Sequence, residues 1–524
     1  MKSVLAIAGI LALASCSSAE DFFTENLGDN NKSVKMTFTA SQENGSATRT
    51  AIGTEGGKTK IHWSESDVIK VTNGTETKDF TLTAGQGTTK ATFNGEISES
   101  ATYYAIYPNQ NDVSFSGNKF SGVELKAEQE AVEGSFDPKA AIMVAKSNGT
   151  NLPFKNVVAY FKVTPTFDCS EIVVTAHKST DALAGTFVVA IGDDGTPSIS
   201  NITKKSREVK LTGIIEKDKD YYILLLPGTF ENGFSVTLKP KDDNTKKYFK
   251  QKNTSFTLNR NDLWNLGTME GATEVSESTI PYITFTADEE QKFKYHDNYT
   301  QAYQDANKYL EYSVNGGEWK KFDGVVSLSA VSFGGGKGNL RLRAKVDQGN
   351  YVASADAGPM FKFGNDNVEV NCTGDIRTLI DYENYYCANT SNAKFMNFFN
   401  SMTNLKSAPY LPSMELASQC YYAMFKGCTG LTTAPELPAT KLNPAYHCYR
   451  DMFNGCSKLS KVTMLATKYS TNWCLDNWLD NAGTSAQSRT LKLASKKVYD
   501  GMKKEGYLPE QWQSDQATIE YNNQ

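Results

Sequence analysis

The chain has 524 residues, an apolar fraction of 39%, a charged fraction of 22% and a formal net charge of −5 at pH 7. This length exceeds what one hydrophobic core supports, so the sequence predicts roughly two to four domains. The acidic balance excludes a general nucleic-acid binder, which needs a basic face to displace counterions from phosphates.

The N-terminal residues predict export and anchoring. An apolar segment at residues 4–13 is too short to span a bilayer and is typical of a signal peptide. It ends in LASC, which resembles the lipobox of bacterial lipoproteins and places the cysteine at Cys16. The resemblance implies that residues 1–15 are removed, that Cys16 carries lipid in the outer membrane, and that residues 16–32 form a tether. The alternative is an ordinary secretory signal that happens to contain Cys16.

Alternating apolar and polar residues predict a β-rich region at residues 33–269. In SVKMTFTA, the side chains of Val34, Met36 and Phe38 fall on one face of a strand. Further short alternating segments follow, separated by Gly, Asn and Asp, without long helical periodicity. This pattern is typical of an all-β sandwich, which we expect to have two halves.

Several segments of this region resemble fimbrillins, the FimA/Mfa-like surface and pilus lipoproteins of Gram-negative anaerobes. They are ATRT at residues 47–50, HW at 62–63, TYYAIYP at 102–108, YILLLPG at 222–228 and NDLWNLGTM at 261–269. The resemblance implies a fimbrillin-like β-sandwich, a cell-surface location and other pilus subunits as partners.

The same resemblance implies a processing site. In polymerising fimbrillins a protease cuts after an arginine near the N-terminus, and the vacated groove accepts a strand of the next subunit. Such a cut between Arg49 and Thr50 would release residues 33–40 and expose a sheet edge. The alternative is that Arg49 is an ordinary loop residue. In shaft subunits of this family the donor strand lies at the C-terminus of the pilin domain. In this chain about 255 further residues follow that position. We therefore expect a tip or accessory subunit.

A polar stretch at residues 270–279 predicts a linker, and alternating segments at residues 280–365 predict a small Ig-like β domain. Asn315-Gly316 is typical of a type I′ hairpin turn. GGGKGN at residues 334–339 has the composition of a phosphate loop but lacks the Lys-Ser/Thr pair, so we expect a connection between strands.

Residues 366–485 contain internal repeats. CYYAMFKGC begins at Cys420 and recurs 28 residues later as CYRDMFNGC at Cys448, and Cys474 follows after a further 26 residues. A period in the twenties predicts a solenoid of stacked coils. GCTGLTTAPELPAT, with MF-x-GC before it, resembles the leucine-rich repeats of BspA-like surface proteins.

Two local features of the sequence predict details of this solenoid, namely the extent of its sheet and its C-terminal end. Pro435 and Pro438 lie beside the strand position, so we expect a sheet limited to two or three residues per coil. Residues 486–524 predict a cap with a helix from about Ser495 to Glu505.

The repeat cysteines are predicted to be buried and free. Met402 and Ala482 stand where other repeats have a second cysteine such as Cys428. A metal site or disulfide does not accept Met or Ala at a ligand position, whereas a packed interior does. A disulfide in the exported protein remains the alternative. A metal site is least favoured because the four histidines are scattered, and no cofactor is expected.

The sequence contains no G-x-S-x-G motif and no histidine pair with metal spacing, although two carboxylates distant in sequence could form a glycosidase site. The repeat region is instead rich in tyrosine, which suits contacts with protein or sugar. Tyr421 and Tyr449 are expected in the core. The candidate ligand-contact residues are Tyr382, Tyr385, Tyr386, Tyr410, Tyr422 and Tyr446.

The sequence therefore predicts a mainly β, non-enzymatic cell-surface lipoprotein adhesin. It would be a pilus tip or accessory subunit that binds a host or bacterial ligand through its repeats. The second interpretation is a surface glycan-binding lipoprotein for nutrient capture, and the third is an enzyme with an unrecognised carboxylate site.

Overall fold

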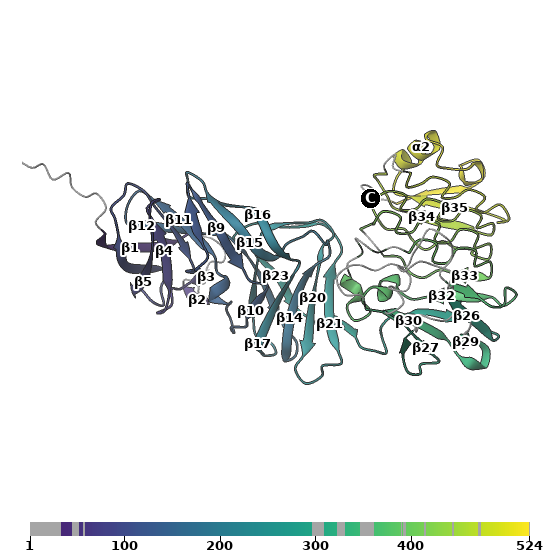
Figure 1. Ribbon diagram of the computed structural model, residues 1–524, viewed down its shortest axis with the longest axis horizontal. Helices are drawn as coiled ribbons and strands as arrows, with labels where there is room; N and C mark the ends of the chain where they lie inside the picture. Colours follow the sequence, from purple (N-terminus) through teal and green to yellow (C-terminus); the bar gives the residue numbers. More distant parts are fainter. Residues whose placement is uncertain are drawn as a thin grey trace, which may run out of the picture.

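The computed structural model is mainly β and elongated, with an N-terminal part and a C-terminal part that meet at one junction (Figure 1). Cys16, Arg49, Thr50, the expected signal peptide and the tether lie outside the described residues. The structure describes residues 33–43, 52–55, 58–295, 309–321, 331–345, 361–388, 390, 393, 395–412, 415–442, 445–469 and 473–522.

The first strand, β1 (Val34–Gln42), closes a barrel. It pairs antiparallel with one neighbour from Val34 to Ser41 and parallel with another from Thr39 to Gln42, so hydrogen bonds occupy both of its edges. The expected sandwich is wrong for this half, because the parallel pairing closes the sheet on itself. Around the barrel, β1 is followed by β12 (Asn151–Asn156), β11 (Met143–Ser147), β7 (Tyr103–Tyr107), β4 (Val68–Thr72), β5 (Thr77–Ala84) and β6 (Lys90–Ile97).

Layered sheets make up the rest of the N-terminal part. The largest runs in the order β10 (Glu128–Glu130), β17 (Glu208–Ile215), β14 (Cys169–Ala176), β20 (Phe234–Pro240), β21 (Lys247–Lys252) and β24 (Thr273–Val275). Because β24 belongs to it, the sheet continues into the segment expected to be a linker. The barrel and these sheets bury one continuous core from Phe38 to Met269.

Smaller sheets complete this part. They are β18 (Tyr221–Leu225), β13 (Ala159–Thr164) and β23 (Leu263–Thr268); β16 (Pro197–Ser206), β15 (Ala184–Ile191), β9 (Lys119–Leu125) and β8 (Ser114–Ser116); β19 (Gly228–Phe230) with β22 (Phe256–Leu258); and β2 (Ile52–Glu55) with β3 (Lys58–Ile61).

The region expected to be an Ig-like domain does not have a core of its own. One sheet runs in the order β28 (Lys320–Lys321), β27 (Leu310–Val314), β30 (Leu340–Ala344), β25 (Ile283–Thr286), β32 (Val370–Thr373) and β33 (Leu405–Ser407), and a second comprises β29 (Val331–Phe333), β26 (Gln291–Tyr295) and β31 (Phe361–Phe363). Since β32 and β33 come from the expected repeats, a single hydrophobic core runs from Ile283 to Trp512. The expected turn is confirmed, with positive φ at Asn315 and Gly316.

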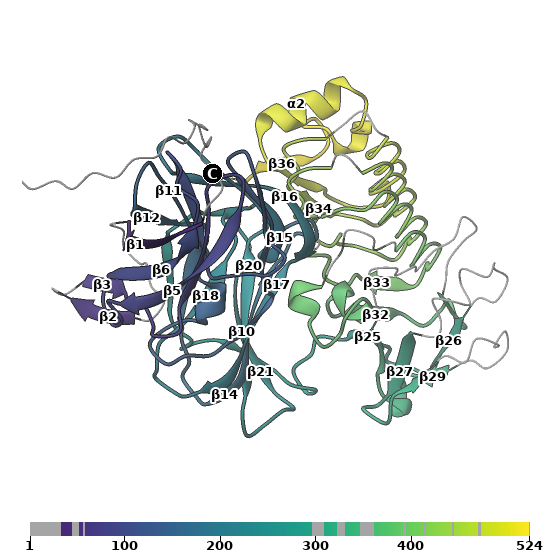
Figure 2. The same cartoon turned by 60° about the vertical axis from the view of Figure 1, so that its left-hand side comes forward.

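The described residues between 395 and 483 wind in successive turns, which we call coils, stacked beside one another (Figure 2). The stacking is a backbone ladder: Phe399 N donates to Met424 O, Phe425 N to Met452 O and Phe453 N to Trp478 O, each at 2.9 Å. The rings of Phe399, Phe425 and Phe453 stack nearly parallel, at centroid distances of 5.2 and 5.7 Å. Equivalent residues of successive coils therefore lie directly over one another.

The five cysteines of the coils, Cys420, Cys428, Cys448, Cys456 and Cys474, are buried inside them as predicted. All eight cysteines of the described chain are free and buried. The thiol of Cys428 donates to Phe399 O at 2.9 Å and that of Cys456 to Phe425 O at 3.0 Å, so each thiol bridges to the preceding coil. Tyr421 and Tyr449 are buried beside them, also as predicted.

The coils form little β-sheet with one another around Pro435 and Pro438. Single β-bridges join Thr433 to Lys461 and Leu437 to Met464, around the two prolines, as the sequence predicts. Parallel strands follow only toward the C-terminal end: β34 (Lys461–Met464), β35 (Thr490–Leu493) and β36 (Thr518–Tyr521).

The helix α2 (Lys496–Lys504) covers this end of the coils. Ser495 caps it by accepting a hydrogen bond from Val498 N, and Gly506 follows with φ of 79°, which confirms the predicted helix and its ends. Within the described residues, no helix has the length and apolarity needed to cross a membrane.

Candidate binding site

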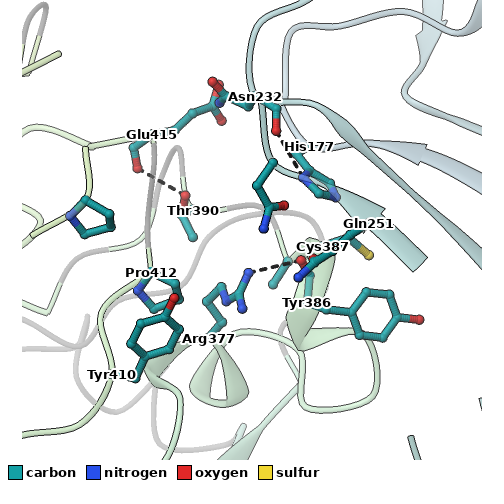
Figure 3. A pocket seen from close by; sticks show the side chains of 13 residues that line it. His177, Asn232, Gln251, Arg377, Tyr386, Cys387, Thr390, Tyr410, Pro412 and Glu415 are labelled. Atoms are coloured by element: carbon teal, nitrogen blue, oxygen red, sulfur yellow. Dashed lines mark hydrogen bonds between the residues drawn. The ribbon is translucent and has the colours of Figure 1, made fainter. Parts of the chain in front are cut away.

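A cleft of about 300 Å³ lies at the junction of the two parts (Figure 3). Its volume is at the lower end of the range for small-molecule sites. The N-terminal part contributes the ends of β14, β20 and β21, and the C-terminal part contributes short 3-10 helices and loops. The lining residues are His177, Asn232, Gln251, Asn253, Arg377, Tyr386, Cys387, Ala388, Thr390, Tyr410, Pro412, Glu415 and Pro438.

One side of the cleft is closed by Tyr386, in the 3-10 helix η5 (Tyr385–Cys387). Its ring stacks on Phe249 of β21, with centroids 4.1 Å apart and planes 6° apart. Its hydroxyl lies 3.1 Å from Thr237 Oγ1 on β20. Arg207 reinforces this side by donating from Nη2 to Cys387 O at 3.0 Å.

Charged residues close the other side. Ser179 N donates to Glu415 Oε2 at 3.3 Å. Glu231 lies between two lysines, 2.9 Å from Lys178 Nζ and 3.5 Å from Lys441 Nζ. The cleft is therefore bounded on two sides by contacts between the parts, which hold its walls at a fixed distance.

Most polar groups inside the cleft already have protein partners. Arg377 donates from Nε and Nη2 to the Asp375 carboxylate, at 3.1 and 2.8 Å, and from Nη1 to Tyr386 O at 3.0 Å. Burial lowers the pKa of His177 to about 4, so its imidazole is neutral, and Nδ1 donates to Asn232 O at 3.2 Å. Burial also raises the pKa of Glu415. The bonds of Arg377 and His177 each lie within one part and fix a wall of the cleft, whereas Glu415 bonds across the junction. The exposed side chains left for a ligand are those of Gln251, Asn253 and Tyr410.

The structure divides the tyrosines predicted to contact a ligand. Tyr386 does not belong to an exposed surface: it is 2% exposed, because Phe249 covers its ring. Tyr382 and Tyr385 are half-buried near the junction. The Tyr382 ring lies 4.2 Å from the Arg343 guanidinium, whose distance to the Trp319 ring is 4.1 Å, so packing occupies one face of Tyr382.

Tyr410, Tyr422 and Tyr446 remain accessible. Tyr410 is 55% exposed at the cleft, Tyr446 is 50% exposed on the coils, and Tyr422 is half-buried near it. The structure thus brings Tyr410 into the cleft and places Tyr422 and Tyr446 on a separate surface.

That separate surface contains two residues that the sequence did not suggest, His447 and Trp473. The Tyr422 ring is 6.4 Å from the His447 ring, which is 5.7 Å from the Trp473 ring. Trp473 is 53% exposed. The signal available in the sequence was their position, because His447 and Trp473 each precede the first cysteine of a repeat.

The arrangement offers hydrogen bonding and aromatic stacking rather than an evident reaction centre. In the part of the chain that the structure describes, no group of three His, Cys, Asp or Glu side chains is placed to hold a metal ion.

Several solved structures resemble the chain weakly. Two are candidate cell adhesion proteins, from Bacteroides ovatus and Bacteroides uniformis, with identities of 10% and 15% and TM-scores of 0.31 and 0.29; each match covers 46% of this chain and 96% or 97% of the other. A fimbrial protein from Bacteroides ovatus matches with 12% identity and a TM-score of 0.24, over 46% of this chain and 50% of its own. TM-scores this low carry no argument about activity. No family model and no curated protein matches the sequence.

Proposed function

We propose that the protein is a cell-surface adhesin, anchored by lipid on Cys16, that presents its coils to a host or bacterial ligand. The observation that carries the proposal is the distribution of exposed aromatic residues. Four large apolar side chains of the described residues are at least half exposed, and three of these are Tyr410, Tyr446 and Trp473, all between β32 and β35. Exposed aromatic side chains of this kind mark interaction surfaces.

In this proposal the coils are a solenoid of the BspA-like leucine-rich type, and such a solenoid suits ligand binding. The ladder of hydrogen bonds between residues 25 to 27 positions apart, such as Phe399 to Met424 and Phe425 to Met452, supports this assignment. Stacked repeats offer a long surface on which equivalent side chains line up in rows, and ligand contacts can extend over several coils.

A role as an accessory or tip subunit of a pilus is the finer part of the proposal. It is supported by the position of β1, which is hydrogen-bonded on both edges and inserts Phe38 into the core. A cut after Arg49 would also detach the rest of the chain from the lipid on Cys16, so in this route the pilus and not the lipid would hold the adhesin at the surface. The cut would release β1 and leave two unpaired edges in the barrel, which a strand of another subunit could fill.

The experiment compares intact cells that express the wild-type chain, Cys16→Ser or Tyr446→Ser. We expect wild type and Tyr446→Ser to be displayed equally, as judged by antibody binding to intact cells, whereas Cys16→Ser is not displayed. Compared with cells that lack the protein, cells that display wild type should attach more to host cells or partner bacteria, and cells that display Tyr446→Ser should show a smaller increase. Full display without any gain in attachment would contradict the adhesin proposal.

A further inference from the structure

Three rings form a strip across the coils, in which Trp473 is exposed and Tyr422 and His447 are half-buried. We use the name ring strip for Tyr422, His447 and Trp473, whose neighbouring centroids are 6.4 and 5.7 Å apart. Each ring comes from a different coil, so the ladder of backbone hydrogen bonds fixes their spacing. Tyr446, half exposed, directly precedes His447.

The backbone under the strip does not favour these residues. Gln419, His447 and Trp473 occupy the same place in successive coils, and all three have positive φ, at 62°, 54° and 55°. In this left-handed region asparagine is well tolerated, whereas a bulky side chain is strained. At the other positive-φ positions of the coils the residues are small or short, namely Asn397, Ser401, Ala423, Asp451, Asn477 and Asn481. Trp473 is far larger than any of these.

Packing does not explain Trp473 either, because the side chain is 53% exposed. The left-handed backbone recurs along the coils and belongs to their geometry, but a bulky side chain in it is strained, and a half-exposed indole gains little from burial in return. Residues held in such sparsely populated conformations cluster at functional positions. A residue kept at a strained position without a gain in stability indicates that the strip is a binding surface.

Size and charge restrict the ligand. An aromatic side chain buries about 150–250 Å² of surface, so three of them together bury less than the ~800 Å² that each partner buries in a standard protein interface. The neighbouring charges have both signs: Lys426 lies 3.2 Å and Arg450 3.7 Å from the Asp451 carboxylate. The strip therefore has no strong field of one sign that would select an anionic or cationic ligand.

We propose that the ring strip binds an uncharged oligosaccharide chain, one sugar unit to each ring, as the centroid distances of 6.4 and 5.7 Å allow. Sugar rings have flat C–H faces that stack on aromatic rings, and hydroxyls that bond to planar polar groups such as those of Arg450 and Gln419. A narrow row of rings along stacked coils matches a linear, chain-like ligand. The inference rests on the proposed function in that it takes the coils as the ligand-contact part.

The test uses the full chain without its first 32 residues and a panel of neutral hexasaccharides: cello-, malto-, laminari-, xylo- and mannohexaose, and poly-N-acetyllactosamine. Binding is measured by titration calorimetry and tryptophan fluorescence. The variants are Trp473→Asn and Tyr422→Ala, with Ile214→Ala as the matched control, because Ile214 is a large apolar side chain, 78% exposed, on β17 of the N-terminal part.

At least one neutral hexasaccharide should bind to wild type, with a loss of tenfold or more in Trp473→Asn and Tyr422→Ala and no change in Ile214→Ala. Trp473→Asn should keep or raise the Tm, because asparagine relieves the strain, so lost binding cannot be ascribed to unfolding. Binding by no member of the panel, or equal binding by wild type and Trp473→Asn, overturns the inference. Retained attachment to cells in either of those cases leaves the adhesin proposal standing, with a ligand other than a neutral oligosaccharide bound at the ring strip.

Discussion

The ring of Tyr386 lies face to face on the ring of Phe249, with centroids 4.1 Å apart, although 137 positions separate the two residues in the chain. This contact connects the N-terminal sheets to the C-terminal part. Together with Val275 and Cys387, the two rings form a small hydrophobic core of their own. The junction is thus a packed interface, and it fixes the orientation in which the coils are presented.

Replacing Tyr386 with alanine should loosen the junction. Truncation of a buried large aromatic residue costs about 3–5 kcal/mol, and here the stacking on Phe249 and the bond to Thr237 are lost as well. We expect faster proteolysis near residues 270–279 and a lower Tm for the C-terminal part. Tyr385→Ala, at a half-buried neighbour, is the control. Equal proteolysis of wild type and Tyr386→Ala would show that the stack does not hold the junction.

The junction should weaken in acid because of His177. Burial above all, with smaller contributions from the charges of Arg377 and Arg207, lowers its pKa to about 4 from an ordinary value of 6.5. The unfolded chain therefore binds more protons between these pH values, so the stability due to neutral His177 is complete above about pH 6.5 and is lost as pH falls toward 4. The slope is at most about 1.4 kcal/mol per pH unit.

Asp181 acts in the opposite sense, because burial raises its pKa to about 6 and its contribution is lost as pH rises through that value. The variant His177→Gln separates the two effects. Between pH 6.5 and 4.5 the wild type should lose more Tm than His177→Gln. Parallel pH profiles would mean that His177 does not titrate with a lowered pKa.

The stability of the barrel should depend on β1, because Phe38 on this strand fills its core. This ring is fully buried and packs edge-on against Phe80 and Tyr103, at centroid distances of 5.1 and 5.0 Å. Phe38→Ala should cost about 3–5 kcal/mol in the free energy of unfolding. Thr39→Ala, at the exposed neighbouring position of the same strand, should cost less than about 0.5 kcal/mol. Chemical denaturation measures both, and similar costs would argue against an inward-facing Phe38.

The cysteines should be unreactive in the folded protein. Burial raises the pKa of the Cys456 thiol to about 12, and all eight cysteines of the described chain are buried and free. Ellman's reagent should label almost none of them in the native chain that begins at residue 33, and all eight in denaturant. Fewer than eight thiols in denaturant, without reductant, would show that disulfides form in the exported protein.

The sequence predicts the coils well because their information is local and repeated. Met402 and Ala482 at cysteine positions indicate a packed interior, and Ser495 with Gly506 marks the ends of α2. Closure of the barrel is missed because it depends on the parallel pairing of β1 with β12, more than a hundred residues apart.

The candidate site is predicted less completely for a similar reason. Tyr385 and Tyr386 look alike in sequence, and only the fold brings Phe249 against one of them. His447 and Trp473 could have been found by comparing the residue before each cysteine, but the sequence does not reveal that the backbone there is left-handed.

The most direct test of the account measures attachment of fluorescent beads coated with the chain from residue 33 onward to host cells and partner bacteria. Beads that carry wild type should attach several-fold more than beads that carry the double variant Tyr446→Ser/Trp473→Asn at the same coating density. Equal attachment of the two, or no attachment of wild type above that of bare beads, would contradict the claim that the aromatic surface of the coils is the adhesive part.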